Sequence, residues 1–294
     1  MSNGARRHLI WFTTAVRYNV IEHSRNKFAM LLVVAFVPTW TVLAYLVIPK
    51  TPIPFRLRAT GQLLAPAGNQ MTQLTGALNA VALITGFMMF AATFTGGRFD
   101  KRLALAGYPR PHLVLAKAAT LTLASALVAA YATAVICMAW SPKQPLQLAT
   151  ALFSSAMTYG ALGVVFGSVL RREVEGMFAV AMTSIVDITL QNPTRSSSAG
   201  SPLVHFLPSH GAIQTATASG FSTTHTPDYL ALQALWFTAT ALLALLAFHR
   251  RTRNALPPKA AGVGLAHVGT EASTVGIDIT TTPPKQSSAP SLAP

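Results

Sequence analysis

The stretch that decides the fold lies at residues 113–140 and reads LVLAKAATLTLASALVAAYATAVICMAW. It contains a single charged residue, Lys117, and exceeds the roughly 20 apolar residues that an α-helix needs to cross ~30 Å of hydrocarbon. Five further apolar runs flank it, at residues 28–48, 74–94, 148–170, 174–190 and 229–248. The sequence therefore predicts an all-α membrane protein with six transmembrane helices.

The composition agrees with a chain that is surrounded by lipid. Of the 294 residues, 51% are hydrophobic and 10% are charged, whereas a soluble domain carries roughly 25% charged residues. The net charge of +14 comes from short basic clusters between the apolar runs, which is typical of topology signals rather than of a nucleic-acid interface. We therefore expect the lipid bilayer as a partner, and no nucleic acid.

The distribution of lysine and arginine predicts the orientation. Sixteen of them lie before the first run, between the second and third, between the fourth and fifth, and after the sixth. Five lie on the opposite side: Lys50, Arg56, Arg58, Lys143 and Arg195. Because positive charge favours the cytoplasmic side, both termini are expected in the cytoplasm and the chain is expected to be multi-pass in the plasma membrane.

Three regions follow from these patterns. Residues 1–27 form a cytoplasmic segment in which Leu9, Phe12, Val16 and Val20 recur at helical spacing. This predicts an N-terminal amphipathic helix on the membrane surface, with an ordinary solvated helix as the alternative. Residues 28–250 form the six-helix transmembrane domain. Residues 251–294, rich in Ala, Thr, Ser and Pro, are expected to be a largely disordered cytoplasmic tail.

Two residues in the apolar runs carry local expectations. Pro38 has no backbone N–H, so it should free a carbonyl in the first span and allow a kink. Cys137 is the only cysteine, and it is expected to be a small buried residue.

The sequence offers no constellation for chemistry. It has no Gly-x-x-x-x-Gly-Lys-Ser/Thr loop, no His-Glu-x-x-His helix, no paired-cysteine metal motif and no Gly-x-Ser-x-Gly elbow. We therefore predict no catalytic residue, no metal and no cofactor within this chain. Its function is expected to lie in moving or binding something within the bilayer.

A few polar or small residues inside the runs stand out. Apart from Glu175, which adjoins the charged turn at residues 171–173, Asp187 is the only acidic residue in a span, where a charge costs ~3 kcal/mol. It is expected either to face a pore or dimer seam, or to sit solvated in the outer interface. Gly160, Gly163 and Gly167 have the spacing of close helix packing, within the chain or at a dimer seam, with a pore lining as the alternative. Lys117 is expected to snorkel to the inner interface.

Residues 98–111, which read RFDKRLALAGYPRP, form the most informative connection. The segment begins charged, becomes apolar and then breaks at Gly107 and Pro109. This predicts a short cytoplasmic helix that presents Phe99, Leu103 and Leu105 to the membrane or to a partner. A plain basic loop is the alternative.

This segment resembles the cytoplasmic stretch of ABC (ATP-binding cassette) type-2 exporter permeases. In that family a basic residue and a leucine-rich turn lead to Gly-x-Pro and then to Leu-x-Leu-Ala-Lys. The matching residues here are Arg102, Leu103, Leu105, Gly107, Pro109 and the stretch 113–117. The glycine-rich residues 160–167 with the charged turn 171–176, and residues 201–208 before the last run, are also similar. The resemblance covers about residues 5–255, and the long proline-rich segment 49–73 departs from it.

The resemblance implies the permease, or pore-forming, subunit of an ATP-driven exporter. Such a subunit moves an amphiphilic or hydrophobic substrate (a drug, antibiotic, lipid or peptide) out of the cell and has no ATPase site. ATP and Mg are bound by a separate ABC ATPase subunit, and a second permease copy or paralogue completes a dimer. Residues 203–218 would form short re-entrant helices at the outer mouth, with a floppy loop as the alternative.

The resemblance also assigns roles to residues. Those that would couple to the ATPase subunit are Arg98, Phe99, Asp100, Lys101, Arg102, Leu103, Leu105, Gly107, Pro109, Glu173 and Glu175. Those that would lie at a pore or seam are Asp187, Gly160, Gly163 and Gly167.

The competing hypothesis is a six-span protein without ATP coupling: a secondary transporter, a sensor subunit or an intramembrane enzyme. Secondary transporters usually place several ionisable or broken-helix sites near the middle of the membrane. Besides Lys117 and Glu175, which lie near the inner ends of their runs, the runs of this chain offer only Asp187. An intramembrane enzyme needs a catalytic pair, and the sequence shows none, so the exporter is the favoured prediction.

Overall fold

The bundle is built around one long helix, α4 (Gly68–Leu105). The computed structural model describes residues 3–25, 27–58, 61–192 and 202–253. The other elements in these ranges are α1 (Asn3–Arg25), α2 (Lys27–Leu31), the π-helix η1 (Leu32–Phe36), α3 (Val37–Val47), β1 (Phe55–Arg56), β2 (Leu63–Leu64), α5 (Arg110–Ala139), α6 (Pro145–Val169), α7 (Glu173–Gln191), the 3-10 helix η3 (Pro202–Phe206), α8 (His210–Phe221) and α9 (Pro227–Arg253). Residues Met1–Leu256 form one compact unit, and the second unit, Pro257–Pro294, lies outside the described residues with most of the predicted tail.

The structure confirms the all-α class. Within the described ranges, four helices are long and apolar enough to cross a membrane: Gly68–Gly97, Arg110–Ala139, Pro145–Val169 and Pro227–Arg250. They contain the second, third, fourth and sixth predicted runs, apart from the last residue of the third run and the last residue of the fourth. A shorter apolar helical stretch, Leu32–Val47, contains most of the first run. The fifth run lies in α7, which has 19 residues and carries three carboxylates.

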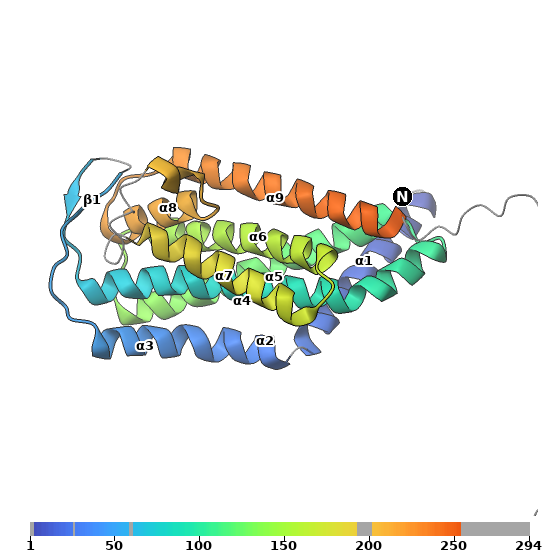
Figure 1. The fold of residues 1–294 in the computed structure, drawn as a ribbon, viewed down its shortest axis with the longest axis horizontal. Coiled ribbons are helices and arrows are strands. Elements are labelled where there is room, and N and C mark those ends of the chain that lie inside the picture. Colours follow the sequence, from blue (N-terminus) through green and yellow to red (C-terminus); the bar gives the residue numbers. More distant parts are fainter. Residues whose placement is uncertain (1–2, 26, 59–60, 193–201, 254–294) are drawn as a thin grey trace, which may run out of the picture. The chain divides into compact units, whose positions relative to one another are not determined.

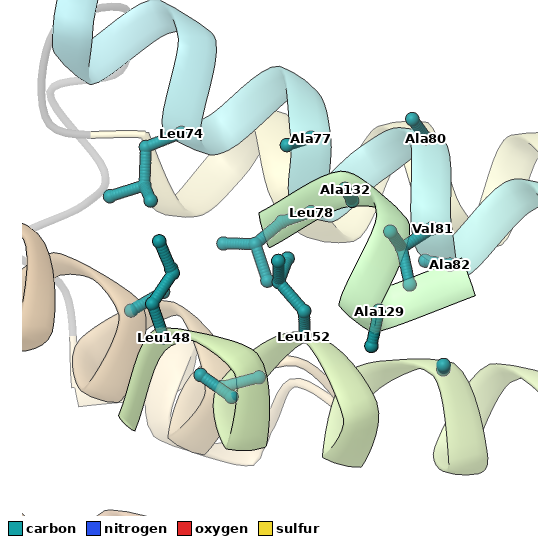
Figure 2. Packing of buried hydrophobic residues seen from close by; sticks show 14 of the residues in the cluster. Leu74, Ala77, Leu78, Ala80, Val81, Ala82, Ala129, Ala132, Leu148 and Leu152 are labelled. Atoms are coloured by element: carbon teal, nitrogen blue, oxygen red, sulfur yellow. The ribbon is translucent and has the colours of Figure 1, made fainter. Parts of the chain in front are cut away.

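The core lies where α4, α5 and α6 pack together (Figure 2). Leu74 and Leu78 of α4 lie across from Leu148 and Leu152 of α6, while alanines such as Ala132 of α5 fill the narrower places. All of these side chains are buried. Alternating large and small residues lets the helices approach closely. Close packing matters here because helices surrounded by lipid associate through van der Waals contact rather than through a hydrophobic driving force.

Pro38 has the local effect that its chemistry predicts. A proline cannot bond to the carbonyl four residues earlier, which here belongs to Val34. The helix widens into the π-turns of η1 immediately before Pro38. The Tyr131 hydroxyl of α5 donates a hydrogen bond of 2.9 Å to the Val34 carbonyl oxygen. A side chain from another helix therefore satisfies the carbonyl that the proline frees.

Replacing Tyr131 with phenylalanine should destabilise the protein by about 1 kcal/mol, because the Val34 carbonyl loses its donor in an apolar setting. The midpoint of unfolding in detergent micelles measures the effect. Tyr45→Phe is the matched control, because the Tyr45 hydroxyl accepts its hydrogen bond from Lys50 Nζ, 3.2 Å away, at an exposed site. Equal midpoints for the two variants would contradict the role of Tyr131.

Helix α4 extends further than the sequence predicts. The separate short helix expected at residues 98–109 is not formed, because residues 98–105 are the last turns of α4. The predicted stop is confirmed. Gly107 has a φ of 85°, a left-handed conformation that favours glycine, and the Tyr108 N–H donates to the Leu103 carbonyl at 3.0 Å.

The connections between the helices lie at two opposite ends of the bundle (Figure 1). One end, here called the basic end, comprises α1, the α4–α5 turn (residues 106–109), the α6–α7 turn (residues 170–172) and the last turns of α9. The other, the hairpin end, comprises β1, β2, η3, α8 and the α5–α6 loop (residues 140–144). Basic residues that the sequence grouped on one side lie in or beside the elements of the basic end: Lys101 and Arg102 in the last turns of α4, Arg110 at the start of α5, Arg171 and Arg172 in the α6–α7 turn, and Arg250 in the last turn of α9.

Helices α5 and α9 expose apolar side chains, including Leu127 and Leu242. Cys137 of α5 is also exposed, so the prediction of a buried cysteine was wrong. The reason is that a lipid-facing surface has the same composition as a core. Hydropathy therefore does not distinguish the two faces of such a helix.

Candidate functional site

The end of α4 presents two different faces at the basic end. Phe99 and Leu105 are 56% and 52% exposed, and Lys101 and Arg102 are exposed beside them. Asp100 is buried and Leu103 is half-buried. Of the other coupling residues implied by the resemblance, Gly107 is exposed and Pro109 half-buried, and Arg98 lies in α4 with its side chain outside the described ones. This helix end thus carries an apolar and basic surface that it does not bury within the chain.

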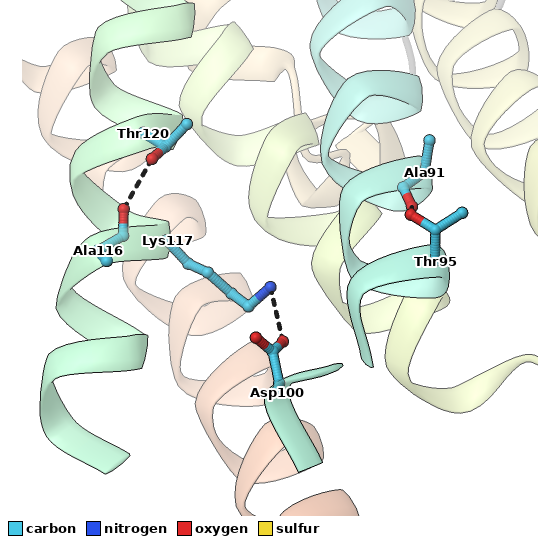
Figure 3. Close-up of polar contacts among 6 residues, drawn as sticks. All are labelled: Ala91, Thr95, Asp100, Ala116, Lys117 and Thr120. Carbon is cyan, nitrogen blue, oxygen red and sulfur yellow. Dashed lines mark hydrogen bonds and ion pairs between the residues drawn. The ribbon is translucent and has the colours of Figure 1, made fainter. Parts of the chain in front are cut away.

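The inward face of this end is fixed by an ion pair (Figure 3). Lys117 Nζ lies 2.9 Å from Asp100 Oδ2, and the two side chains are only 11% and 10% exposed. Lys117 therefore does not snorkel to the interface as expected. A carboxylate on the neighbouring helix supplies the counter-charge that a mostly buried ammonium requires. The pair links the end of α4 to the second turn of α5.

Helix α1 packs against the same end. The Tyr108 hydroxyl donates to the Trp11 carbonyl at 2.5 Å, and burial raises the pKa of this hydroxyl, which keeps it a donor. The Trp11 ring lies 6.2 Å from that of Tyr108 and 6.1 Å from that of His112, centre to centre. A cavity of about 420 Å³ separates Tyr18 of α1 from Phe99 and other residues of α4. The predicted N-terminal helix thus lies against the α4–α5 turn.

Glu173 and Glu175 lie in the first turn of α7, at the same end of the bundle. Both are exposed. Carboxylates in this position are stabilised by the helix dipole. The 3.6 Å contact between Arg172 Nε and Glu175 Oε1 is solvent-exposed and contributes little. These acidic groups are therefore available at the surface of the basic end.

Asp187 lies near the hairpin end and is only 2% exposed. Its carboxylate accepts a hydrogen bond from the Tyr159 hydroxyl of α6, one of 2.5 Å from Gln191 Nε2 and one of 3.0 Å from the Ser209 N–H. The alternative of a solvated interface residue is therefore wrong. The four-residue spacing of Asp187 and Gln191 on one helix face was a signal for part of this cluster, but Tyr159 and Ser209 gave none.

The cluster continues to a histidine. Gln191 Nε2 donates to Ser209 Oγ at 2.9 Å as well as to Asp187, so its Oε1 is free to accept. His210 Nδ1 lies 2.9 Å from that oxygen, which assigns the imidazole proton to Nδ1. His210 Nε2 is then a buried acceptor, and it has no hydrogen-bond partner among the described residues. Protonation of His210 would therefore place a proton on a buried nitrogen that has no acceptor nearby among the described residues.

A second side chain holds the same segment from α9. Gln233 Nε2 donates to Thr158 Oγ1 at 2.8 Å and to the Pro208 carbonyl at 3.0 Å. Gln233 Oε1 accepts from the Ala212 N–H at 3.0 Å. The start of α8 is thus bonded on one side to α7 and on the other to α9. The prediction of short helices in this region is confirmed by η3 and α8, and the alternative of a floppy loop is wrong for these residues.

The three glycines of α6 lie in helix contacts inside the chain. A Cβ at Gly163 would lie 2.3 Å from the Gly86 carbonyl oxygen of α4, and one at Gly167 would lie 2.8 Å from the Phe90 carbonyl oxygen. At Gly160 the nearest atom would be Leu121 Cδ1 of α5, at 2.2 Å. Of the alternatives, close packing within the chain is what the geometry shows at these positions.

An apolar groove of about 490 Å³ lies between α5, α6 and α9. Leu121, Val164, Phe237 and Leu245 are among the residues that line it, and Lys117 is the one charged residue among the described residues of this lining. The described part of the chain brings no three potential metal ligands together.

No protein-family model matches the chain, and no curated protein matches it either. Function is therefore inferred from the residues and their arrangement.

Proposed function

We propose that this chain is the permease subunit of an ATP-driven ABC exporter, multi-pass in the plasma membrane. The observation that carries the proposal is the end of α4, which extends beyond its apolar part and exposes Phe99 and Leu105 among Lys101 and Arg102. Apolar side chains exposed on a charged helix end favour a protein partner. The sequence around them resembles the segment with which exporter permeases contact their ATPase subunit.

The proposed topology has six spans with both termini in the cytoplasm. The first span is the continuous α2, η1 and α3, and the fifth is α7. The gathering of basic residues at one end supports the assignment of that end to the cytoplasm. The hairpin end then faces outward.

A movement of a partner at the basic end can be transmitted to the other end of the bundle by α4. ATP and Mg bind to the ATPase subunit, and its movement displaces the end of α4. Helix α4 has 38 residues without a break, which corresponds to about 57 Å at 1.5 Å per residue. A displacement at one end therefore tilts a rigid rod that reaches the other. Glu173 and Glu175 add acidic contacts at the same surface.

The groove between α5, α6 and α9 suits an apolar chain, and it supports an amphiphilic or hydrophobic cargo such as a drug, antibiotic, lipid or peptide. A second copy or a paralogue would complete the pore. In this proposal Asp187 and the three glycines of α6 stabilise the helix packing within each subunit.

The test is co-purification of the tagged chain from its own membranes, followed by assay of ATP hydrolysis and identification of bound P-loop proteins. Arg102→Glu combined with Leu105→Asp should reduce the bound ATPase at least about tenfold, because both a charge and an apolar contact are reversed. The matched control is Arg56→Glu with Leu63→Asp, a similarly exposed pair in the hairpin at the opposite end.

Two results would contradict the proposal. The wild-type chain would bind no ATPase, or the variant at the α4 end would retain it as fully as the hairpin variant does. Either result would favour a six-span protein without ATP coupling.

A further inference from the structure

Helix α8 is inserted among other helices rather than lying on the surface. Every residue of α8 except Gln214 is buried, and the helix contacts α4, α6, α7 and α9. Its far end packs through Phe221, whose ring stacks on Trp140 at 5.3 Å. Its start is held by hydrogen bonds to Asp187 and Gln191 on one side and to Gln233 on the other. A change of charge at the start of α8 would therefore weaken the contacts that hold this helix in the bundle.

We propose that Asp187 and His210 form an acid-sensitive latch, which holds the start of α8 in the bundle and releases it when His210 is protonated. The inference needs neither the proposed orientation nor an ATPase partner. It rests on the hydrogen bonds of Asp187, Gln191, Ser209 and His210.

A proton on His210 finds no acceptor in the closed arrangement. Nδ1 already donates to Gln191, so the added proton goes to Nε2, which is buried without a partner among the described residues. The His205 ring of η3 lies 4.6 Å away, centre to centre, and Arg58 Nη1 lies 2.9 Å from His205 Nε2. Arg58 therefore places positive charge close enough to His210 to disfavour a second charge on the imidazole. A charged His210 is both desolvated and repelled.

The surrounding elements offer little compensation. On α7, the Asp187 carboxylate is engaged by Tyr159, Gln191 and Ser209, and the Gln191 amide separates it from the imidazole. On α9, Tyr229 lies 5.8 Å from the ring of His210, and Asp228 is exposed in the first turn. The sequences of α6 and of α4 as far as Gly97 contain no charged residue, and Lys143 adjoins the opposite end of α8.

The direction of the pH effect follows from the pKa of His210. Burial, followed by the charges of His205 and Arg58, lowers it from 6.5 to about 4. Once α8 is released, the imidazole regains its ordinary pKa. The closed state is therefore fully favoured above the ordinary value and loses its advantage as the pH falls towards 4. Between about pH 7.5 and about pH 5 the equilibrium constant for opening should rise about 30-fold.

Hydrogen exchange of the full chain in lipid nanodiscs measures this opening. Exchange is followed by mass spectrometry at about pH 7.5 and about pH 5 and corrected for the intrinsic pH dependence of the exchange reaction. The protection of peptides from α8 should fall about 30-fold in acid. The protection of peptides from α6 should stay unchanged, because that helix has no group that titrates in this range.

Two variants separate the latch from a general effect of acid. His210→Gln keeps a donor for Gln191 but does not titrate, so α8 should be equally protected at both pH values. His225→Gln, at an exposed histidine of the same end, should leave the wild-type response intact. Equal protection of wild-type α8 at both pH values would overturn the latch. So would a full response in His210→Gln, or a parallel loss of protection in α6.

Discussion

Alanine in place of Gly163 should destabilise the protein by about 3 kcal/mol, although alanine is the better helix former by about 1 kcal/mol. The added Cβ would lie 2.3 Å from the Gly86 carbonyl oxygen and 3.0 Å from the Phe90 nitrogen, both on the backbone of α4. Backbone atoms inside a helix cannot move aside singly, so the two helices must separate. Helices α4 and α6 form the most extensive helix contact in the described structure, and separating them loosens the core.

Gly160→Ala is the matched control, three residues earlier on the same helix. There the added Cβ meets Leu121 Cδ1, the tip of a flexible side chain that can rotate away. We expect its effect to stay within about 1 kcal/mol, since a better helix propensity offsets a small rearrangement. Unfolding midpoints in mixed detergent micelles compare the two variants. Similar midpoints for both would show that the α4–α6 approach tolerates a side chain and is not set by Gly163.

The helices were predictable because their signals are local. A run of apolar residues at the length of a bilayer specifies a helix without knowledge of its neighbours. Gly107 marks a helix end through its own backbone conformation, and Pro38 frees a carbonyl through its own missing N–H. Residues 98–105 show the limit of such signals. Their charge suggested a new element, but no residue before Gly107 interrupts α4.

The polar clusters were not predictable, because they depend on how the helices face one another. Asp187 was recognisable as a costly residue, but its donors come from α6, α7 and the segment before α8. His210 gave no sign of being buried, since most histidines in loops are solvated. The prediction for Cys137 was wrong for a related reason, because the sequence of an apolar run does not indicate which face of the helix is exposed. The partners and the burial of these three residues are determined by tertiary packing.

Breaking the ion pair between Asp100 and Lys117 should have the other large effect. Asp100→Leu or Lys117→Leu alone leaves one nearly buried charge without its partner, and each should cost about 3 kcal/mol or more. The double leucine variant removes both charges and fills the space with apolar groups, so its stability should return to within about 1 kcal/mol of the wild type. A double-mutant cycle of unfolding midpoints measures the coupling between the two residues.

The exposed pair Arg172 and Glu175 provides the control cycle. Its side chains are 82% and 52% exposed, so its leucine variants should show a coupling below about 1 kcal/mol. Additive losses at Asp100 and Lys117 would contradict the ion pair as the link between the end of α4 and α5. A strong coupling would show that this end, with Phe99 and Leu105 on its outer face, is held in one position against α5. Such a fixed position is what a helix needs if it is to pass a push from a partner into the bundle.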